Sequence, residues 1–262
     1  MKRNILFILL LLSTTLFAQD TFQLAPPLLQ YGSIFFVSKT EVIIKFAQAG
    51  SAVHYTLNGN EPTDKDPIYT KPVIISKNFT TVRAKAFGKN FRPSEIVGAT
   101  FIKDGIPIKS IDQTNPNEKY PGTGNNTLID NKGGIEQSGS DTWMGYNCDK
   151  VSITIDIGKK HPVKMVLLNL LESEKAWIFL PEQILVYSYE EKSGSFVPFG
   201  KETLFFDETT PGTHCDYRII NGRREIKTSK LLIDIYVMKH MPDWHPSKGE
   251  HAWLFIDEIK VY

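Results

Sequence analysis

"VSITIDIG", residues 151–158, decides the fold class of this chain. Val151, Ile153, Ile155 and Ile157 alternate with other residues, which is the period-two pattern of a strand with one buried face. The segment "KLLIDIYV", residues 230–237, repeats the alternation. No stretch of a dozen residues shows the 3.6-residue period of an amphipathic helix. The sequence therefore predicts an all-β protein.

Short strand-like segments also fill the first half of the chain, between Ile34 and Phe101. They read "EVIIKF", "AVHYTL", "TTVRAKAF" and "EIVGATF" and are separated by Gly, Pro, Asn and Asp. Their spacing of roughly 8–12 residues is typical of a small β-sandwich. The segment 104–119, "DGIPIKSIDQTNPNEK", has little apolar periodicity and is predicted to be a linker. Two tandem β-sandwiches are the expected architecture.

The composition does not favour a strongly charged binding partner. The chain has 41% hydrophobic and 23% charged residues and a formal net charge of +1. Such a balance gives no global field for nucleic acid or an anionic membrane. No segment after the N-terminus approaches the ~18 apolar residues that cross a bilayer, so membrane insertion is not expected.

The N-terminus has the pattern of a secretory signal peptide. Lys2 and Arg3 precede an apolar run from Ile5 to Leu12, and a small residue, Ala18, marks the expected cleavage site. Residues 1–18 therefore predict export to the periplasm, the cell surface or the medium. An exported chain could join Cys148 and Cys215 in a disulfide, but sequence alone does not show that they meet.

Several separated motifs in the first half resemble one known module. They are Tyr55-Thr56, Gly59, Glu61-Pro62-Thr63, Tyr69, Pro72, "TVRAKAF" and Pro93-Ser94. Residues 26–103 thereby resemble the Ig-like or fibronectin-III-like sandwich that follows the catalytic barrel of bacterial chitobiases and β-hexosaminidases. In those enzymes the module carries no catalytic residue.

The second half resembles a discoidin, or factor V/VIII type C, jelly roll. The resemblance rests on "LIDNKGG", "TWMGY", "VSITIDIG" and, above all, the last 22 residues, "MPDWHPSKGEHAWLFIDEIKVY". It covers residues 120–262 and is strongest toward the version at the C-terminal end of family 20 glycoside hydrolases. The catalytic domain of that family is a TIM barrel of about 250 residues, for which this chain has no room before the first module. The resemblance therefore implies a non-catalytic tail rather than an enzyme.

The acid pair Asp257-Glu258 is the obvious catalytic candidate. Adjacent side chains of a strand point to opposite faces, so the two acids would not address one substrate atom unless a bulge intervened. A glycosidase needs two carboxyl groups about 5–10 Å apart across one bond. We expect Asp257 to share a face with Phe255, Ile259 and Val261 and Glu258 to point away, which does not favour catalysis.

The resemblance also implies one structural Ca²⁺, held between an early loop and the last strand. Asp130 and Glu258 match the two side-chain positions, and Lys132 and Asp257 are candidate backbone donors. Oxygen ligands of this kind suit a hard cation. Asn131 departs from the family, which usually has Gly there. The alternative is that Glu258 accepts loop N–H bonds without a metal.

Exposed aromatic residues are the candidate sugar-binding groups. Trp177 and Trp244 lie in expected loops, and His245 adjoins Trp244. Sugar rings stack on aromatic faces while nearby polar groups bond the hydroxyls. The alternative is that both indoles pack a loop against a strand or the neighbouring module. Trp143 and Trp253 are expected in the core.

The sequence thus predicts an exported, non-catalytic protein that binds glycans, including N-acetylhexosamine-containing chains. The alternative is a structural or protein-interaction module that partners a separate glycoside hydrolase or a surface protein. An enzyme with an unrecognised site is the least favoured of the three.

Overall fold

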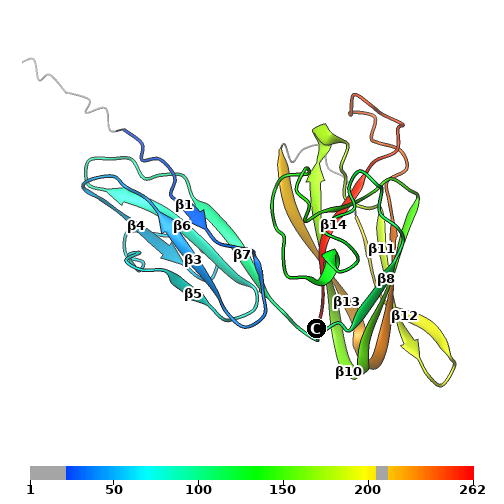
Figure 1. Ribbon diagram of the computed structural model, residues 1–262. Helices are drawn as coiled ribbons and strands as arrows, with labels where there is room; N and C mark the ends of the chain where they lie inside the picture. Colours follow the sequence, from blue (N-terminus) through cyan, green and yellow to red (C-terminus); the bar gives the residue numbers. More distant parts are fainter. Residues whose placement is uncertain (1–21, 205–211) are drawn as a thin grey trace, which may run out of the picture.

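The computed structural model describes residues 22–204 and 212–262, so the predicted signal peptide lies outside the described residues. Figure 1 shows two β-modules that follow one another along the chain. The described residues contain strands and two short 3-10 turns, η1 (Thr127–Ile129) and η2 (Glu174–Ala176). No helix in this part of the chain is long and apolar enough to cross a membrane. The prediction of an all-β protein is confirmed.

The first module is a sandwich of two sheets. Its strands are β1 (Leu28–Gln30), β2 (Phe35–Phe36), β3 (Thr40–Lys45), β4 (Ser51–Thr56), β5 (Val73–Ile75), β6 (Thr80–Gly88) and β7 (Val97–Lys103). One sheet has the order β1-β3-β5 and the other β2-β7-β6-β4, with β2 parallel to β7. Alternate residues of β3 and β6, such as Val42 and Val82, are fully buried between the sheets. This inward alternation forms the core of the sandwich.

The second module is one continuous sheet of paired strands that folds over into two layers. It contains β8 (Ser110–Gln113), β9 (Met144–Tyr146), β10 (Lys150–Ser173), β11 (Gln183–Glu190), β12 (Ser195–Thr203), β13 (Thr213–Tyr236) and β14 (Leu254–Val261). β10 and β13 each have 24 residues and bend midway. The register of their pairing shifts between Asp156 and His161 and again between Val163 and Met165. Bulged strands bend in this way, so β10 and β13 contribute to both layers of the module.

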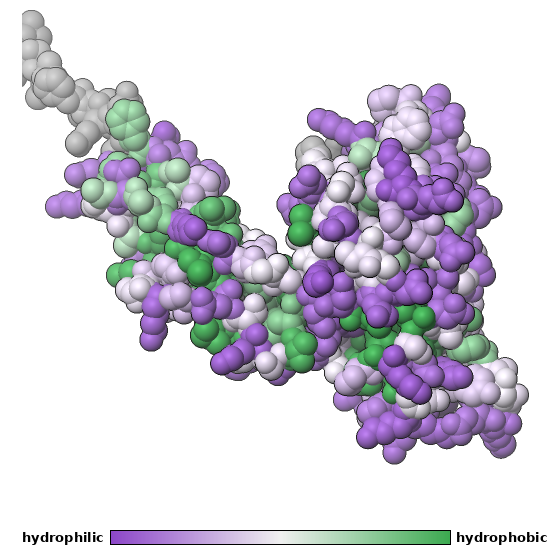
Figure 2. Space-filling model, in the orientation of Figure 1, coloured by the Kyte–Doolittle hydropathy of each residue, from purple (hydrophilic) through white to green (hydrophobic). Residues whose placement is uncertain are grey.

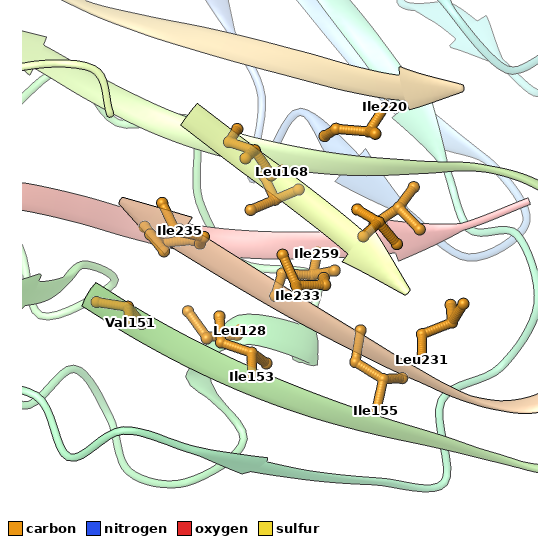
Figure 3. Packing of buried hydrophobic residues seen from close by; sticks show 14 of the residues in the cluster. Leu128, Val151, Ile153, Ile155, Leu168, Ile220, Leu231, Ile233, Ile235 and Ile259 are labelled. Atoms are coloured by element: carbon orange, nitrogen blue, oxygen red, sulfur yellow. The ribbon is translucent and has the colours of Figure 1, made fainter. Parts of the chain in front are cut away.

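The two layers enclose one apolar core. The front layer joins β8, the first part of β10, the second part of β13, β11 and β12; the back layer joins β9, β14 and the remaining parts of β10 and β13. Figure 3 shows Ile153 and Ile233 of the front layer facing Leu168 and Ile259 of the back layer. The alternation of residues 151–157 therefore marks a buried strand face, as predicted.

The predicted linker is shorter than residues 104–119. β8 lies inside this segment and pairs with β10, from Ile153↔Gln113 to Asp156↔Ser110. Ile106, Ile108 and Ile111 pack against the core of the second module. Only Ile111 of these three lies in β8, and a single apolar residue gives no strand signal, which is why the sequence pattern missed this strand.

The two modules are in direct contact. Ile34, Phe35 and Ile102 of the first module form one buried cluster with Leu167 of the second. The Tyr262 hydroxyl donates to the Lys103 carbonyl at 2.6 Å. The interface therefore combines apolar burial with hydrogen bonds near the point where the chain passes from one module to the other (Figure 1).

Candidate functional site

The last strand contains a bulge at the acid pair. Asn169 pairs with Glu258, but the next residue, Leu170, pairs with Ile256. Asp257 is therefore the extra residue of a β-bulge, and the alternation of faces changes there. This corrects the expectation that the two acids point to opposite faces.

The bulge divides β14 into two halves with opposite phase. Ile256 and Ile259 both face the core of the module, although they are an odd number of residues apart. Phe255 packs on the other side of the strand, with Trp143 and Leu171. Phe255 therefore does not share a face with Ile259 and Val261, contrary to expectation. A one-residue slip of this kind moves every later side chain to the other face.

Asp257 is fully buried and held by two donors. The Gly134 N–H donates to Oδ2 at 2.7 Å, and Asn169 Nδ2 donates to Oδ1 at 2.8 Å. Burial raises the pKa of Asp257 to about 7, and the two hydrogen bonds oppose that rise. With both oxygens bonded to protein donors, this carboxyl group has no free oxygen to offer a substrate.

Glu258 is fully buried beside an ammonium group. Lys260 Nζ lies 3.0 Å from Glu258 Oε1, 2.7 Å from Asn131 Oδ1 and 2.7 Å from Asp104 Oδ1. It also lies 5.5 Å from the centre of the Phe35 ring. Burial raises the pKa of Glu258 to about 8, and Lys260 opposes the rise. The Lys260 side chain is only 3% exposed, so this ammonium acts as an internal cation joining both modules.

The backbone conformation and contacts of Asn131 explain why Asn stands where the family usually has Gly. Its φ is +62°, in the left-handed region that Gly and Asn tolerate best. Its amide accepts from Lys260 through Oδ1 and donates to Asp104 Oδ2 at 3.2 Å through Nδ2. Glycine could adopt the backbone conformation but could not make either bond. Asn131 therefore belongs to the Lys260 cluster, which we define as Lys260, Glu258, Asn131 and Asp104.

The predicted calcium residues do not form a ligand set. Asp130 accepts the Lys132 N–H at 2.9 Å in a local turn, and both Asp257 oxygens are engaged elsewhere. Among residues 22–204 and 212–262, no three His, Cys, Asp or Glu side chains gather as a metal site would require. Glu258 Oε2 has no hydrogen-bond partner among them, but the Lys260 ammonium at Oε1 would repel a divalent ion. The residues present do not fit Ca²⁺ while Lys260 is charged.

Replacing Asp257 with Asn should flatten the pH dependence of stability. The folded-state pKa is raised from 3.8 to about 7, so the native state holds a proton that the unfolded state releases. This contribution is fully present below pH ~4 and is lost as the pH rises to about 7. Each pKa unit corresponds to about 1.4 kcal/mol, so Asp257→Asn should gain on the order of 2–4 kcal/mol relative to wild type across that range.

Urea unfolding of both proteins from pH 4 to pH 7 measures this difference, because groups that do not interact with Asp257 titrate alike in both proteins and Glu258 titrates mainly above this range. Asp112→Asn, an exposed residue of β8, is the control and should give a curve parallel to wild type. Parallel curves for Asp257→Asn as well would contradict the assignment of a proton to Asp257.

Trp177 and Trp244 lie on adjoining loops at one end of the second module. Trp177 follows η2 with φ +64°, and Trp244 lies in the segment between β13 and β14. Their exposed fractions are 42% and 37%, high values for the largest apolar side chain. The Trp253 N–H donates to the Trp177 carbonyl at 2.8 Å, which fixes the first loop against the last strand.

His245 is a structural residue and not the expected sugar contact. Its exposed fraction is 6%. The Ser247 N–H donates to Nδ1 at 3.1 Å, and Nε2 lies 3.1 Å from the Glu174 carbonyl oxygen. Both ring nitrogens are therefore engaged within the protein, and the imidazole joins the loop of Trp244 to the loop of Trp177. This corrects the prediction for His245 while explaining why the two loops adjoin.

Polar groups that sequence reasoning missed lie near Trp177 along the chain. Glu172, near the end of β10, is 3.0 Å from His214 Nε2, and the two positions pair directly between β10 and β13. Burial raises the pKa of Glu172, and His214 opposes the rise. The two are 42 positions apart (214 − 172), so no local motif connects them. Strand pairing alone brings them together.

The other two Trp residues and the cysteines have structural surroundings. Trp143 is 1% exposed, as expected for a core residue, and its indole N–H donates to the Ile135 carbonyl at 2.9 Å. Trp253 is partly buried against the same cluster. Cys148 and Cys215 are both free thiols, so the open question of a disulfide between them is answered in the negative.

Comparison with known families identifies the first module. Residues 32–98 match the family model described as chitobiase/beta-hexosaminidase C-terminal domain. The match confirms the resemblance predicted from the motifs between Tyr55 and Ser94. No curated protein matches the chain.

Parts of this chain are similar to several solved structures, all at low identity and with TM-scores below 0.5. A family 32 carbohydrate-binding module of Clostridium perfringens NanJ, solved with galactose, is 12% identical with a TM-score of 0.38, covering 60% of this chain and 97% of that module. Another module of Clostridium perfringens, solved with GlcNAc-alpha-1,4-galactose, is 18% identical with a TM-score of 0.35, covering 58% and 88%. A GH29 fucosidase of Ruminococcus gnavus is 13% identical with a TM-score of 0.35; this chain covers 24% of its length.

Proposed function

We propose that this chain is a non-catalytic carbohydrate-binding protein and that the loops of Trp177 and Trp244 bind the glycan. One observation carries the proposal: two indoles, 42% and 37% exposed, stand on adjoining loops that His245 and Trp253 hold in place. Large aromatic side chains held rigidly in solvent suit the apolar faces of sugar rings, and their rigidity lowers the entropy lost on binding.

The ligand class is inferred from polar groups close to Trp177 in the chain. Glu172, which pairs with His214, and Glu174 offer acceptors and a donor for sugar hydroxyls. The basic residues near the two indoles in the sequence, Lys175 and Lys248, are matched by the acids Glu174 and Asp243, so a neutral glycan is favoured over an anionic one. The match of the first module to the chitobiase family supports N-acetylhexosamine chains as the first ligands to test.

Catalysis at the acid pair is not part of the proposal. Asp257 and Glu258 are both fully buried and bonded to protein groups, whereas a glycosidase needs two carboxyl groups that reach one bond. Export through the segment 1–18 remains part of the proposal and is tested by N-terminal sequencing of the protein from its host.

A protein-binding role is the second candidate. Leu28, Val37, Ile68 and Ile74 of the first module have exposed fractions of 62%, 65%, 55% and 54%. Exposed apolar side chains on a small sandwich favour a protein partner, such as a separate glycoside hydrolase or a surface protein. Co-purification of a stable partner by a protein that binds no sugar would favour this role over the first.

Replacing Trp177 or Trp244 with Ala should weaken glycan binding at least about tenfold, which is ~1.4 kcal/mol. Titration calorimetry with N-acetylchitooligosaccharides and with galactosides measures the change. Ile74→Ala removes an exposed apolar side chain from the first module and should leave the affinity unchanged. A wild-type protein that binds none of these sugars, or Trp variants that bind as tightly as wild type, would refute the proposed site.

A further inference from the structure

A cavity lies between the two modules, and none of the residues that line it belongs to the loops of Trp177 and Trp244. Its volume is about 510 Å³, and both modules line it. The first module contributes β6 and β7 through Arg83 and Gly98, and the second contributes β10 and β13 through Asn169 and Tyr217. Figure 2 shows a notch between the modules that opens to solvent. We call this cavity the inter-module cleft.

The walls of the inter-module cleft are fixed relative to each other. The Lys260 cluster ties Asp104, which follows β7, to the loop and last strand of the second module. The Ser33 hydroxyl donates to the Gly133 carbonyl at 3.4 Å, and Gly134 lies against Ile34 so closely that a Cβ there would be 2.5 Å from it. A cavity with walls held by such contacts is preformed, which is typical of small-molecule sites.

The cleft has a buried polar group whose bonding is incomplete. Asn169 has no exposed surface and lines the cleft. Its Nδ2 donates to Asp257, but its Oδ1 has no hydrogen-bond partner among the described residues. An unpaired buried acceptor costs about 1–3 kcal/mol, so such groups are rare outside functional sites or hydrated positions. A donor from a ligand hydroxyl would satisfy it.

Two tyrosine rings line the cleft and are held by packing. Tyr31 lies edge-on to Phe101 with ring centres 5.0 Å apart, and Tyr217 packs on Phe79 at 6.4 Å. The pKa of Tyr31 is raised by its burial and, next, by the negative charge of Glu136. The phenol of the first module and the acid of the second therefore face the same space.

The charges of the lining groups balance. Arg83 and Glu136 are the only formally charged residues among those that line the cleft, and both are exposed. One positive and one negative group give no net attraction for a strongly charged ligand. The apolar area comes from the tyrosine rings and from Ile34, Ile96 and Ala99. Aromatic walls, a buried amide and a balanced charge pair suit a neutral molecule with many hydroxyls.

We propose that the inter-module cleft is a second binding site, which takes a segment of a neutral oligosaccharide. A ligand hydroxyl donates to Asn169 Oδ1, the rings of Tyr31 and Tyr217 contact the sugar faces, and Arg83 and Glu136 bond hydroxyls at the mouth. This site does not depend on the Trp loops, and it gives the first module a direct part in binding.

The test uses the full chain with the loop site removed. Trp177→Ala/Trp244→Ala is titrated with tetra-N-acetylchitotetraose, cellotetraose and galactotetraose. It should bind at least one of them, and adding Arg83→Ala or Tyr217→Ala should weaken that binding at least tenfold. The side-chain amide signals of Asn169 should shift on binding in the NMR spectrum of the double variant. Trigalacturonate should not compete.

Three results would overturn the proposal. The double variant could bind none of the three neutral sugars, it could bind them with an affinity that Arg83→Ala and Tyr217→Ala leave unchanged, or trigalacturonate could displace them. Arg83 is exposed, so its replacement does not threaten folding, and Lys89→Ala is a matched exposed control on the same module. If wild type binds these sugars and the Trp177→Ala/Trp244→Ala variant binds none of them, the loop site stands and the inter-module cleft does not.

Discussion

Replacing Lys260 with Met should destabilise the protein by about 3–5 kcal/mol, the range found when one partner of a buried ion pair is removed. Met keeps most of the apolar stem, so the change removes the ammonium with little loss of volume. Glu258 would then be buried with no positive partner, and Asn131 Oδ1 would lose its donor at 2.7 Å. Asp104, 31% exposed, can recover hydration and adds less to the loss.

Urea unfolding at pH 9 measures this effect, because Glu258, whose pKa is raised to about 8, is then ionised beside Lys260. Lys164→Met is the matched control, because Lys164 pairs with Glu225 at 3.2 Å but the two side chains are 72% and 47% exposed. Such a surface pair contributes about 0–1 kcal/mol, so this variant should unfold close to wild type. If Lys260→Met is as stable to urea as Lys164→Met, the Lys260 ammonium does not contribute to stability as an internal cation.

The same variant tests the calcium prediction directly. With Lys260 in place, added Ca²⁺ should leave the unfolding curve unchanged, since the ammonium occupies the oxygens of Glu258 and Asn131. In Lys260→Met those oxygens are free for a cation, so millimolar Ca²⁺ should restore part of the lost stability through binding to the native state. Stabilisation of wild type by Ca²⁺ would instead support a metal site.

The fold could be predicted because apolar residues alternate with period two along the long strands. Val151, Ile153 and Ile155 alternate without interruption and are all fully buried. The bends of β10 and β13 were not predictable in the same way. They depend on register shifts near Gly158 and Val163. The residue types at these positions are common in strands and turns, so they do not reveal the change in pairing.

The bulge at Asp257 shows where sequence reasoning about the site fails. One extra residue reverses the faces of everything after it, and nothing in "FIDEIKV" marks the insertion. A usable signal was still present: Glu258 and Lys260 are two positions apart, so period two puts opposite charges on one face whatever happens before them. Asp104 could not have been added from sequence, because only the docking of the two modules brings it there.

The loops were predicted in part for a similar reason. The positions of Trp177 and Trp244 outside the strands follow from nearby Pro, Gly and charged residues, which are local signals. The role of His245 depends on Glu174, which is 71 positions away. Long-range contacts of this kind determine whether a polar side chain in a loop is free for a ligand, and a single sequence does not contain them.

Replacing Trp143 with Ala should destabilise the protein by about 3–5 kcal/mol, the usual range for deleting a buried aromatic side chain. The indole is 1% exposed and packs with Leu171, Ile178 and Phe255 on the outer side of the back layer. Its N–H also holds the Ile135 carbonyl at 2.9 Å, next to Glu136 of the inter-module cleft. Both the cluster and one wall of the cleft therefore depend on this side chain.

Trp143→Phe separates these two effects. The smaller ring keeps much of the packing, and the lost hydrogen bond should cost about 0.5–1.5 kcal/mol, with a further loss from the unfilled volume. If the bond positions Glu136, the Phe variant should bind neutral oligosaccharides more weakly in the Trp177→Ala/Trp244→Ala background while remaining folded by circular dichroism. Unfolding and binding measured on the same samples decide the matter: reduced stability with unchanged binding would mean that the loop at residues 135–142 is set by other contacts and that Trp143 serves the core alone.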